Sequence, residues 1–272
     1  MASKYLDERL LEAYRSHQYN FSSGKLAGRV VLVSGGTGGL GSAFVAWLLS
    51  QGGIPVVGYK SNHARAQHVQ SLLQSRFSRS VHLVSGNIEE ESVRTQYMKV
   101  ASSMTGVLYG FVCFAGEPAR LRFEELTSKA VGDSLAANYI GPVLLAKLVA
   151  QALIERKAEG SIIFISSVQG VAPFENSLNY GVPKAALIHA AKILAKQWRK
   201  ERIRVNVVAP GATVVGMAEA SIRSGKYDKY IESQAITRFG YPEDVALTIG
   251  LLLQPDGYIT GQVITVDGGL SL

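Results

Sequence analysis

Short apolar runs rich in β-branched residues alternate along the chain with longer stretches of helical character. Most runs are continuously apolar, which is typical of strands buried on both faces. The expected strands are Val30–Ser34, Val56–Tyr59, Val81–Ser85, Gly110–Phe114, Ser161–Ser166, Val205–Ala209 and Val263–Val266. The expected helices are Leu40–Gln51, Ala64–Gln74, Glu91–Ser103, Lys129–Arg156, Leu178–Lys200 and Pro242–Leu253. This alternation predicts an α/β fold with one doubly wound, seven-stranded parallel sheet flanked by helices.

The chain shows no linker, internal repeat or low-complexity stretch, so we expect a single domain over residues 26–272. Apolar residues recur at helical spacing within residues 1–25, which predicts an N-terminal helical extension that packs on its own domain or on a partner subunit. Residues 211–236 form an irregular polar stretch after the sixth strand, a common position for a substrate lid.

The charge distribution and the cysteine content indicate which kinds of binding partner and which cellular compartment to expect. The net charge is +7, but residues 13–88 hold seven Lys and Arg and no Asp or Glu. This favours a localised anion site over a nucleic-acid surface, although a solvated basic face explains the charge equally well.

The single cysteine, Cys113, is expected to be buried in a strand and fits a reducing compartment. With a charged N-terminus and no uninterrupted apolar run long enough to span a bilayer, we expect a cytoplasmic protein without a membrane partner. The histidines lack the spacing of metal ligands, so no metal is expected.

A glycine-rich loop joins the first strand to its helix. Gly35, Gly39 and Gly41 have the spacing G-x-x-x-G-x-G. Glycines allow the backbone to approach a pyrophosphate closely, and the following helix N-terminus offers free N–H groups and the positive end of its dipole. The loop therefore predicts a dinucleotide site, with a tight strand-to-helix turn as the alternative.

The end of the second strand indicates which dinucleotide. A carboxylate there would bind the adenosine ribose of NAD, but the first acidic residue after the loop is Glu89. Lys60, Ser61 and Asn62 instead offer a charge and hydrogen-bond donors to a 2′-phosphate. NADP is therefore favoured over NAD.

A tyrosine and a lysine stand together at the start of the fifth expected helix. Tyr180 and Lys184 are four residues apart and share one helix face. A neighbouring ammonium lowers a tyrosine's pKa from its usual value near 10, so Tyr180 could act as a general acid or base. Pro183 is expected in the first turn, where its missing N–H costs little. Alone, such a pair is usually only a surface contact.

Taken together, these motifs resemble the classical short-chain dehydrogenase/reductase family over about residues 26–272. The glycine loop matches, with Ser34 in place of the family's threonine, and Ser167 lies 13 residues before Tyr180. Asn138 matches the family's asparagine, and Pro210-Gly211 its proline-glycine pair. Within the family, residues 238–246 and 259–269 look like 3-oxoacyl-[acyl-carrier-protein] reductases.

The resemblance implies a Rossmann-type fold, a homotetramer built on the two long helices, and NADP(H) across the carboxyl ends of the strands. It implies that Tyr180 gives a proton to a carbonyl oxygen that Ser167 binds, that Lys184 lowers the pKa of Tyr180, and that Asn138 orders a water. The implied catalytic residues are Asn138, Ser167, Tyr180 and Lys184. The implied cofactor-binding residues are Gly35, Thr37, Gly38, Gly39, Leu40, Gly41, Lys60, Ser61, Asn62, Asn87, Ile88, Ala115, Gly116, Tyr180, Lys184, Pro210, Gly211 and Thr213.

The chain departs from the family pattern at several cofactor positions. The family's N-N-A-G is Cys113-Phe114-Ala115-Gly116, and Asn87 replaces an aspartate near the adenine. Val215 replaces the threonine that would bind the carboxamide, a role for which Thr213 is a candidate substitute. Glu117, Arg120 and Phe174 are candidates for the substrate pocket.

Three functions remain open. The leading hypothesis is an NADPH-dependent reductase of a 3-oxoacyl thioester, whose acidic carrier protein or coenzyme A phosphates would suit a basic surface. The second is a reductase or dehydrogenase of a free small alcohol, sugar or polyketide. The third is a catalytically weak nucleotide-binding protein that acts through residues 1–25.

Overall fold

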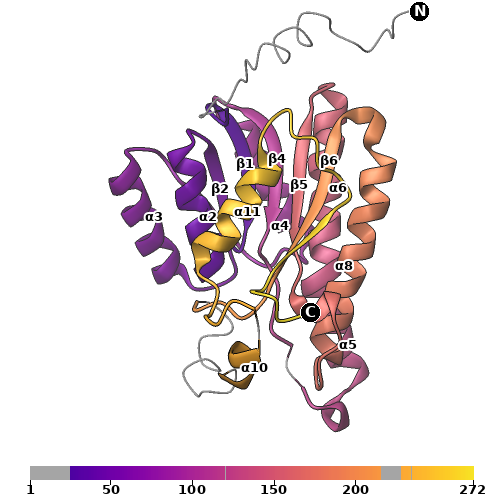
Figure 1. Ribbon diagram of the computed structural model, residues 1–272. Coiled ribbons are helices and arrows are strands. Elements are labelled where there is room, and N and C mark those ends of the chain that lie inside the picture. The colour runs from indigo at the N-terminus through magenta and orange to yellow at the C-terminus, as the bar shows by residue number, and fades with distance from the viewer. Residues whose placement is uncertain (1–24, 120, 216–227, 234) are drawn as a thin grey trace, which may run out of the picture.

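The computed structural model describes residues 25–119, 121–215, 228–233 and 235–272. Seven strands form one parallel sheet in the order β3-β2-β1-β4-β5-β6-β7 (Figure 1). The strands are β1 (Arg29–Ser34), β2 (Ile54–Tyr59), β3 (His82–Ser85), β4 (Val107–Cys113), β5 (Gly160–Ile165), β6 (Ile203–Pro210) and β7 (Val263–Val266). The strand order reverses between β1 and β4, which is where open α/β sheets bind their ligands. The predicted single-domain, doubly wound fold is confirmed.

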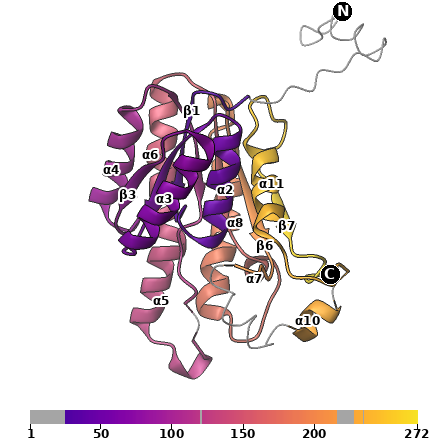
Figure 2. The same ribbon diagram turned by 90° about the vertical axis from the view of Figure 1, so that its left-hand side faces the viewer.

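Helices cover both faces of the sheet. The α-helices are α2 (Gly39–Ser50), α3 (His63–Phe77), α4 (Glu91–Ser102), α5 (Ser128–Leu135), α6 (Gly141–Glu155), α7 (Val168–Val171), α8 (Leu178–Gln197), α10 (Asp228–Ser233) and α11 (Pro242–Leu253). The other helical turns are η1 (Phe123–Glu125), the π-helix η2 (Ala136–Ile140) and η3 (Arg199–Glu201). Seen from the β3 edge, α4 and α6 lie on one side of the sheet, while α2 and α11 lie on the other (Figure 2).

Each central strand supplies alternate residues to two cores. In β1, Val30 and Leu32 face the core beneath α4, α6 and α8, whereas Val31 and Val33 face the core beneath α2, α3 and α11. All four side chains are fully buried. This explains why the strand sequences are continuously apolar and show no period of two.

One glycine in the sheet leaves room for a helix side chain. A Cβ atom on Gly58 in β2 would lie 1.3 Å from the hydroxyl of Tyr97, which comes from α4. Tyr97 is only 3% exposed, and burial raises the pKa of its hydroxyl. Gly58 therefore allows α4 to pack directly on β2.

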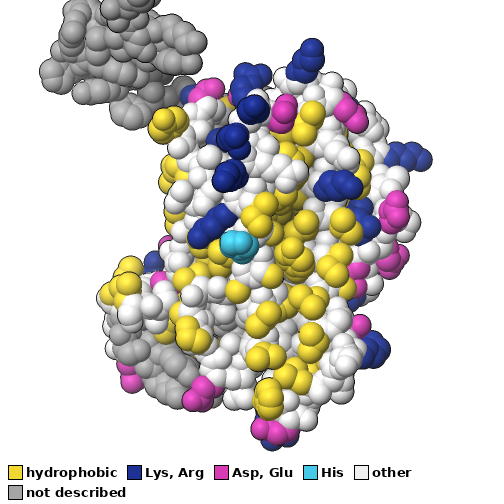
Figure 3. Space-filling model, turned by 90° about the vertical axis from the view of Figure 1, so that its right-hand side faces the viewer, with side chains coloured by type: hydrophobic (Ala, Val, Ile, Leu, Met, Phe, Trp, Pro, Cys, Tyr) yellow, Lys and Arg dark blue, Asp and Glu magenta, His cyan; other side chains and the backbone are white. Residues whose placement is uncertain are grey.

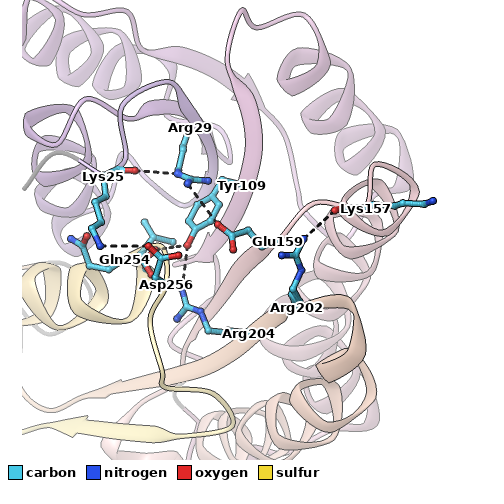
Figure 4. Close-up of polar contacts among 10 residues, drawn as sticks. Lys25, Arg29, Tyr109, Lys157, Glu159, Arg202, Arg204, Gln254 and Asp256 are labelled. Carbon is cyan, nitrogen blue, oxygen red and sulfur yellow. Dashed lines mark hydrogen bonds and ion pairs between the residues drawn. The ribbon is translucent and has the colours of Figure 1, made fainter. Parts of the chain in front are cut away.

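A polar network fastens the segment after α11 to the amino ends of three strands (Figure 4). Arg204 from β6 donates to the carbonyl of Gln254 at 2.7 Å and to the hydroxyl of Tyr109 from β4 at 3.2 Å. The guanidinium of Arg29 from β1 lies 4.4 Å from the centroid of the Tyr109 ring and also pairs with Glu159. These contacts hold the edge of the sheet opposite the carboxyl ends.

The longest expected helix, Lys129–Arg156, is not regular. It is divided into α5 and α6 by η2, in which the N–H of Gly141 bonds the carbonyl of Ala136. Pro142 has no N–H, so the carbonyl of Asn138 cannot take part in the ordinary helical ladder at this point. The π-helix lies directly before this interruption and contains Asn138.

Among the described residues, the helical stretch 128–155 is long and apolar enough to cross a membrane by length and composition alone. Half of its apolar window is buried inside the domain, where Leu145, Val149 and Leu153 are fully buried against the sheet. The core of the fold therefore accounts for the apolar character of this inner face.

Two predicted segments cannot be compared with the structure in full. Residues 1–24 of the expected N-terminal extension and residues 216–227 and 234 of the expected lid lie outside the described residues. The short α10 lies within the lid segment and was not expected from the sequence.

The position expected for Pro183 is wrong. Helix α8 begins at Leu178, so Pro183 lies inside the helix and removes the donor that would bond the carbonyl of Asn179. The hydroxyl of Ser134 from α5 donates to that carbonyl instead. Ser134 and Asn179 are 3% and 5% exposed, so this bond supplies the missing donor to a buried carbonyl and connects α5 to α8.

We expect Ser134→Ala to lower the free energy of unfolding by about 1–3 kcal/mol, because a buried carbonyl loses its donor. In a Pro183→Ala background the helix regains a backbone N–H at this position, and the same Ser134→Ala change should cost markedly less. Urea denaturation of the four proteins measures both effects. An equal cost in the two backgrounds would show that the Ser134 hydroxyl does not compensate for Pro183.

Candidate active site

The predicted catalytic residues converge at the carboxyl edge of the sheet. Ser167 follows β5, Tyr180 and Lys184 lie in the first half of α8, and Asn138 lies in η2. Gly116, after β4, marks their meeting point. A Cβ atom there would lie 2.6 Å from Oδ1 of Asn138 and 3.3 Å from Nζ of Lys184.

Lys184 is almost completely buried, at 3% exposure. Its Nζ donates to the carbonyl of Ile165 at 3.0 Å and lies 5.6 Å from the centroid of the Tyr180 ring. Burial lowers the pKa of Lys184 to about 8, because the charged form loses its hydration. The lysine can therefore both place positive charge beside Tyr180 and exchange a proton near neutral pH.

Asn138 is fully buried and binds the backbone of the loop after β4. Its Oδ1 accepts from the N–H of Glu117 at 3.2 Å, and its Nδ2 donates to the carbonyl of the same residue at 3.1 Å. Nδ2 also lies within hydrogen-bond distance of the carbonyl and hydroxyl oxygens of Ser134. The amide thus holds the loop after Gly116 in a fixed position beside Lys184.

Ser167 lies at the start of α7, where its Oγ accepts from the N–H of Gln169 at 3.2 Å. Helix α7 packs tightly on α8: a Cβ atom on Gly170 would lie 2.8 Å from the carbonyl carbon of Lys184. The neighbouring Ser166 donates to the carbonyl oxygen of Lys184 at 2.9 Å. These contacts bring Ser167 to the edge of the sheet where Tyr180 lies.

The glycine loop forms a cradle that larger residues would fill. Gly35 has φ +67°, and a Cβ atom on it would lie 2.8 Å from the amide nitrogen of Ala115. A Cβ atom on Gly41 would lie 2.4 Å from the carbonyl oxygen of Gly35. Among the described residues, no side chain caps α2 and none in its first turn is acidic, so its N-terminus faces the loop with its N–H groups. This arrangement fits the pyrophosphate of a dinucleotide.

The other residues predicted for the loop surround this cradle. Gly38 is the N-terminal cap of α2, and Gly39, Leu40 and Gly41 are its first residues. Thr37 is buried. Because the side chain of Thr37 points into the protein, the backbone of the turn forms the surface that would receive the cofactor.

At the end of β2 two of the three predicted phosphate-binding residues have side-chain partners in the protein. Lys60 forms an ion pair with Glu117, and its pKa is raised chiefly by the hydrogen bond to that carboxylate. Oδ1 of Asn62 accepts from the N–H of Arg65 at 3.0 Å and caps α3. Ser61 is exposed, and the first turn of α3 contains no acidic residue.

The turn after β3, which contains Asn87 and Ile88, is held by a side chain that the sequence motifs do not include. Arg94 from α4 is 7% exposed and donates to the carbonyls of Ile88 and Glu89 at 2.8 and 2.6 Å. Ile88 packs against the start of α6, where a Cβ atom on Gly141 would lie 2.9 Å from its side chain. The turn is thereby fixed beside the predicted adenine site.

The remaining predicted residues lie after β6. Pro210 ends that strand, and a Cβ atom on Gly211 would lie 2.7 Å from the Cβ of Asp267. Thr213 is 3% exposed, and its hydroxyl donates to the carbonyl of Gly211 at 3.3 Å. The role of Thr213 as a substitute for the missing threonine stays a prediction.

Cys113 occupies the first position of the altered N-N-A-G sequence. It is 1% exposed, accepts a hydrogen bond from the hydroxyl of Ser34 at 3.2 Å, and burial raises the pKa of its thiol to about 11. The prediction of a buried strand cysteine is confirmed. Among the described residues, no three His, Cys, Asp or Glu side chains group together as metal ligands would.

Sequence reasoning missed two residues that shape this site and gave a third a different role. Ser134 and Arg94 act through backbone carbonyls, for which a linear sequence gives no sign. Glu117 was expected only as a candidate pocket residue, whereas its backbone holds Asn138 and its side chain holds Lys60. The unusual acidic residue next to Gly116 was the one available signal.

Comparison with known proteins places this geometry in a family. The family profile described as Enoyl-(Acyl carrier protein) reductase matches residues 35–271. A tropinone reductase homolog of Arabidopsis thaliana is 31% identical over 253 residues, covering 91% of this chain and 94% of that protein. The 3-oxoacyl-[acyl-carrier-protein] reductase FabG of Aquifex aeolicus is 32% identical over 248 residues, covering 90% and 98%.

The fold has close counterparts among solved structures. A short-chain type dehydrogenase/reductase from Mycobacterium ulcerans superposes with a TM-score of 0.85 at 25% identity, covering 90% of each chain. Matches of this extent leave no large part of the α/β domain without a counterpart. The chain therefore belongs to the short-chain dehydrogenase/reductase family, whose members are oxidoreductases that bind a nicotinamide dinucleotide.

Proposed function

We propose that this protein is an NADPH-dependent reductase of carbonyl groups, with a 3-oxoacyl thioester as the leading substrate class. The observation that carries the proposal is the arrangement at the carboxyl edge: Lys184 is buried beside the ring of Tyr180, within reach of the Asn138 amide. The glycine cradle lies at the same edge, so a bound dinucleotide would meet these side chains.

Each side chain of the candidate site has a separate role in the proposed reduction. The Ser167 hydroxyl binds the substrate carbonyl and stabilises the charge that develops on its oxygen. Tyr180 gives its phenolic proton to that oxygen, and the Lys184 ammonium stabilises the phenolate that remains. NADPH, when bound, supplies the hydride that reduces the carbonyl carbon. Asn138 keeps the loop after Gly116 in place beside Lys184. As the family resemblance implies, it also orders a water that links Lys184 to solvent.

The charge around the adenosine end supports NADPH over NADH. Lys60 follows β2, and the first turn of α3 presents a helix N-terminus without a carboxylate. A 2′-phosphate would gain a cation and the positive end of the helix dipole at this place. The ribose of NADH would lack the carboxylate that normally holds its hydroxyls.

The spacing within α8 supports reduction of C=O rather than C=C. Tyr180 and Lys184 are four residues apart, whereas the related enoyl reductases space their tyrosine and lysine further apart. Both curated relatives described above are named as ketone reductases or their homologs, although the matching family profile carries an enoyl reductase description. The basic net charge of +7 fits an acidic carrier protein or coenzyme A phosphates.

A free small carbonyl compound is the second candidate substrate class. The similarity to a tropinone reductase homolog favours it, because that likeness is as extensive as the likeness to the 3-oxoacyl reductase. The third hypothesis, a catalytically weak binding protein, draws on the replaced asparagines at Cys113 and Phe114. The convergence of Tyr180, Lys184 and Asn138 argues against it.

We expect the protein to oxidise NADPH in the presence of an acetoacetyl thioester, and Tyr180→Phe to lower kcat by at least about 100-fold, the usual contribution of a positioned acid. Absorbance of NADPH follows the reaction. Turnover only with free ketones would select the second substrate class. Tight NADPH binding without turnover on a broad carbonyl panel would contradict the enzymatic proposal.

We further propose that the protein is a homotetramer, with one interface formed by the outer faces of α5, α6 and α8. Apolar side chains run in a stripe over this face (Figure 3). The stripe includes Ile140, Leu144, Leu178, Val182 and Ile193, each 36–55% exposed. A cavity of about 500 Å³ opens on the same face beside Leu178 and Val182, on the side of α8 opposite Tyr180. An apolar patch of this kind is typical of an interface.

Light scattering of the purified protein is expected to give the mass of four chains, and Val182→Arg to dissociate it by burying a charge in the interface. Lys192→Met, a change of a charged residue on the same helix, serves as the control. A monomeric wild-type protein would contradict the proposal.

A further inference from the structure

An ion pair joins two loops that the fold keeps apart. Nζ of Lys60 contacts Oε1 of Glu117, although the residues lie 57 positions apart in the chain. Lys60 follows β2 directly, and Glu117 lies in the loop after β4. In the sheet these two strands are not neighbours, because β1 lies between them.

The strand register shows what the pair passes over. Val57 of β2 and Val112 of β4 both align with Val33 of β1. Residues beyond these positions therefore flank the chain that follows β1, and that chain is the glycine loop beginning at Gly35. With strands about 4.8 Å apart, the pair spans roughly 10 Å across the crevice that the cradle opens into. The adenosine end of a dinucleotide bound on the loop would therefore lie next to this pair.

Breaking the ion pair between Lys60 and Glu117 costs little free energy. The side chains of Lys60 and Glu117 are 56% and 46% exposed. Ion pairs at such exposed positions contribute little to stability. Asn138 binds only the backbone of Glu117, so the carboxylate can leave Lys60 without disturbing the loop beside Lys184.

We propose that Glu117 is a specificity-determining residue, whose carboxylate occupies Lys60 in the free protein and competes there with the 2′-phosphate of the cofactor. This inference rests on the proposed preference for NADPH. A phosphorylated ribose exchanges one anionic partner of Lys60 for another, so the lysine stays paired throughout. NADH offers no phosphate and gains nothing by opening the pair. Glu117 therefore lowers the affinity for NADPH and leaves that for NADH nearly unchanged.

The test compares cofactor binding to the whole protein, measured by the fluorescence of NADPH and NADH. Glu117→Gln keeps the size of the side chain and removes the charge, and should tighten NADPH binding about two- to five-fold, the range expected for one exposed ion pair. Lys60→Met should weaken NADPH binding. In the Lys60→Met background, Glu117→Gln should have less than half of its effect, because the competition has been removed.

Glu89 provides a matched control. It also acts on Lys60 electrostatically, but no hydrogen bond joins the two among the described contacts. Glu89→Gln should change NADPH affinity less than Glu117→Gln does. Equal effects of the two variants would overturn the proposal, because they would reflect general repulsion of the phosphate rather than competition for Lys60.

Two other results separate this inference from the proposed function. If the wild-type protein binds NADPH no better than NADH and Lys60→Met changes neither, both the cofactor preference and the competition are wrong. If Lys60→Met weakens NADPH binding but Glu117→Gln does not tighten it, the preference stands and the role of Glu117 is overturned.

Discussion

A lysine ammonium buried at the carboxyl edge of the sheet is the constraint around which the candidate site is arranged. Lys184 has one hydrogen-bond acceptor among the described contacts, the carbonyl of Ile165, and its burial disfavours the charged form. The surroundings must therefore be held close and correctly oriented. Helix α7 packs on the backbone of Lys184, and the Asn138 amide fixes the loop beside its ammonium. Gly116 leaves space where a side chain would collide with the Asn138 amide and crowd the ammonium. The ammonium lies beside Tyr180, one turn earlier on α8, where it would stabilise the phenolate form of that side chain.

The support for this arrangement comes from interruptions in regular structure. Pro142 interrupts the helical ladder at Asn138, and the π-helix just before it contains the asparagine that binds the Glu117 backbone. Pro183 removes a donor inside α8, and Ser134 replaces it. Both interruptions meet at one small polar cluster between α5 and α8, because Asn138 also contacts Ser134. Local irregularity of this kind, stabilised by the surrounding packing, is common at functional sites.

The sequence predicted the sheet, and it singled out candidate site residues that lie at one edge of it, because those features leave strong local patterns. Continuous apolar strands, the glycine loop and the spacing of Tyr180 and Lys184 can each be recognised within a few residues. The ion pair of Lys60 with Glu117 could not be predicted, since it depends on strand order and on side chains 57 positions apart. The role of Ser134 was hidden because its partner is a backbone carbonyl. The start of α8 at Leu178 was predicted correctly, but Pro183 is the sixth residue of that helix and so lies beyond its first turn. The cofactor preference, argued from Lys60, Ser61, Asn62 and the missing carboxylate, omitted Glu117 because that residue is distant in the sequence.

The most direct test of this account is the pH dependence of stability conferred by Lys184. Its pKa is lowered to about 8 from 10.5, so at intermediate pH the unfolded chain binds a proton that the folded protein does not. Stability therefore rises with pH over this window. Urea denaturation between about pH 7 and pH 10 should show the wild-type free energy of unfolding rising relative to that of Lys184→Met, by up to about 1.4 kcal/mol per pH unit. A constant difference between the two proteins across the window would mean that Lys184 keeps its ordinary pKa, and would contradict the buried acid–base centre on which the proposed function depends.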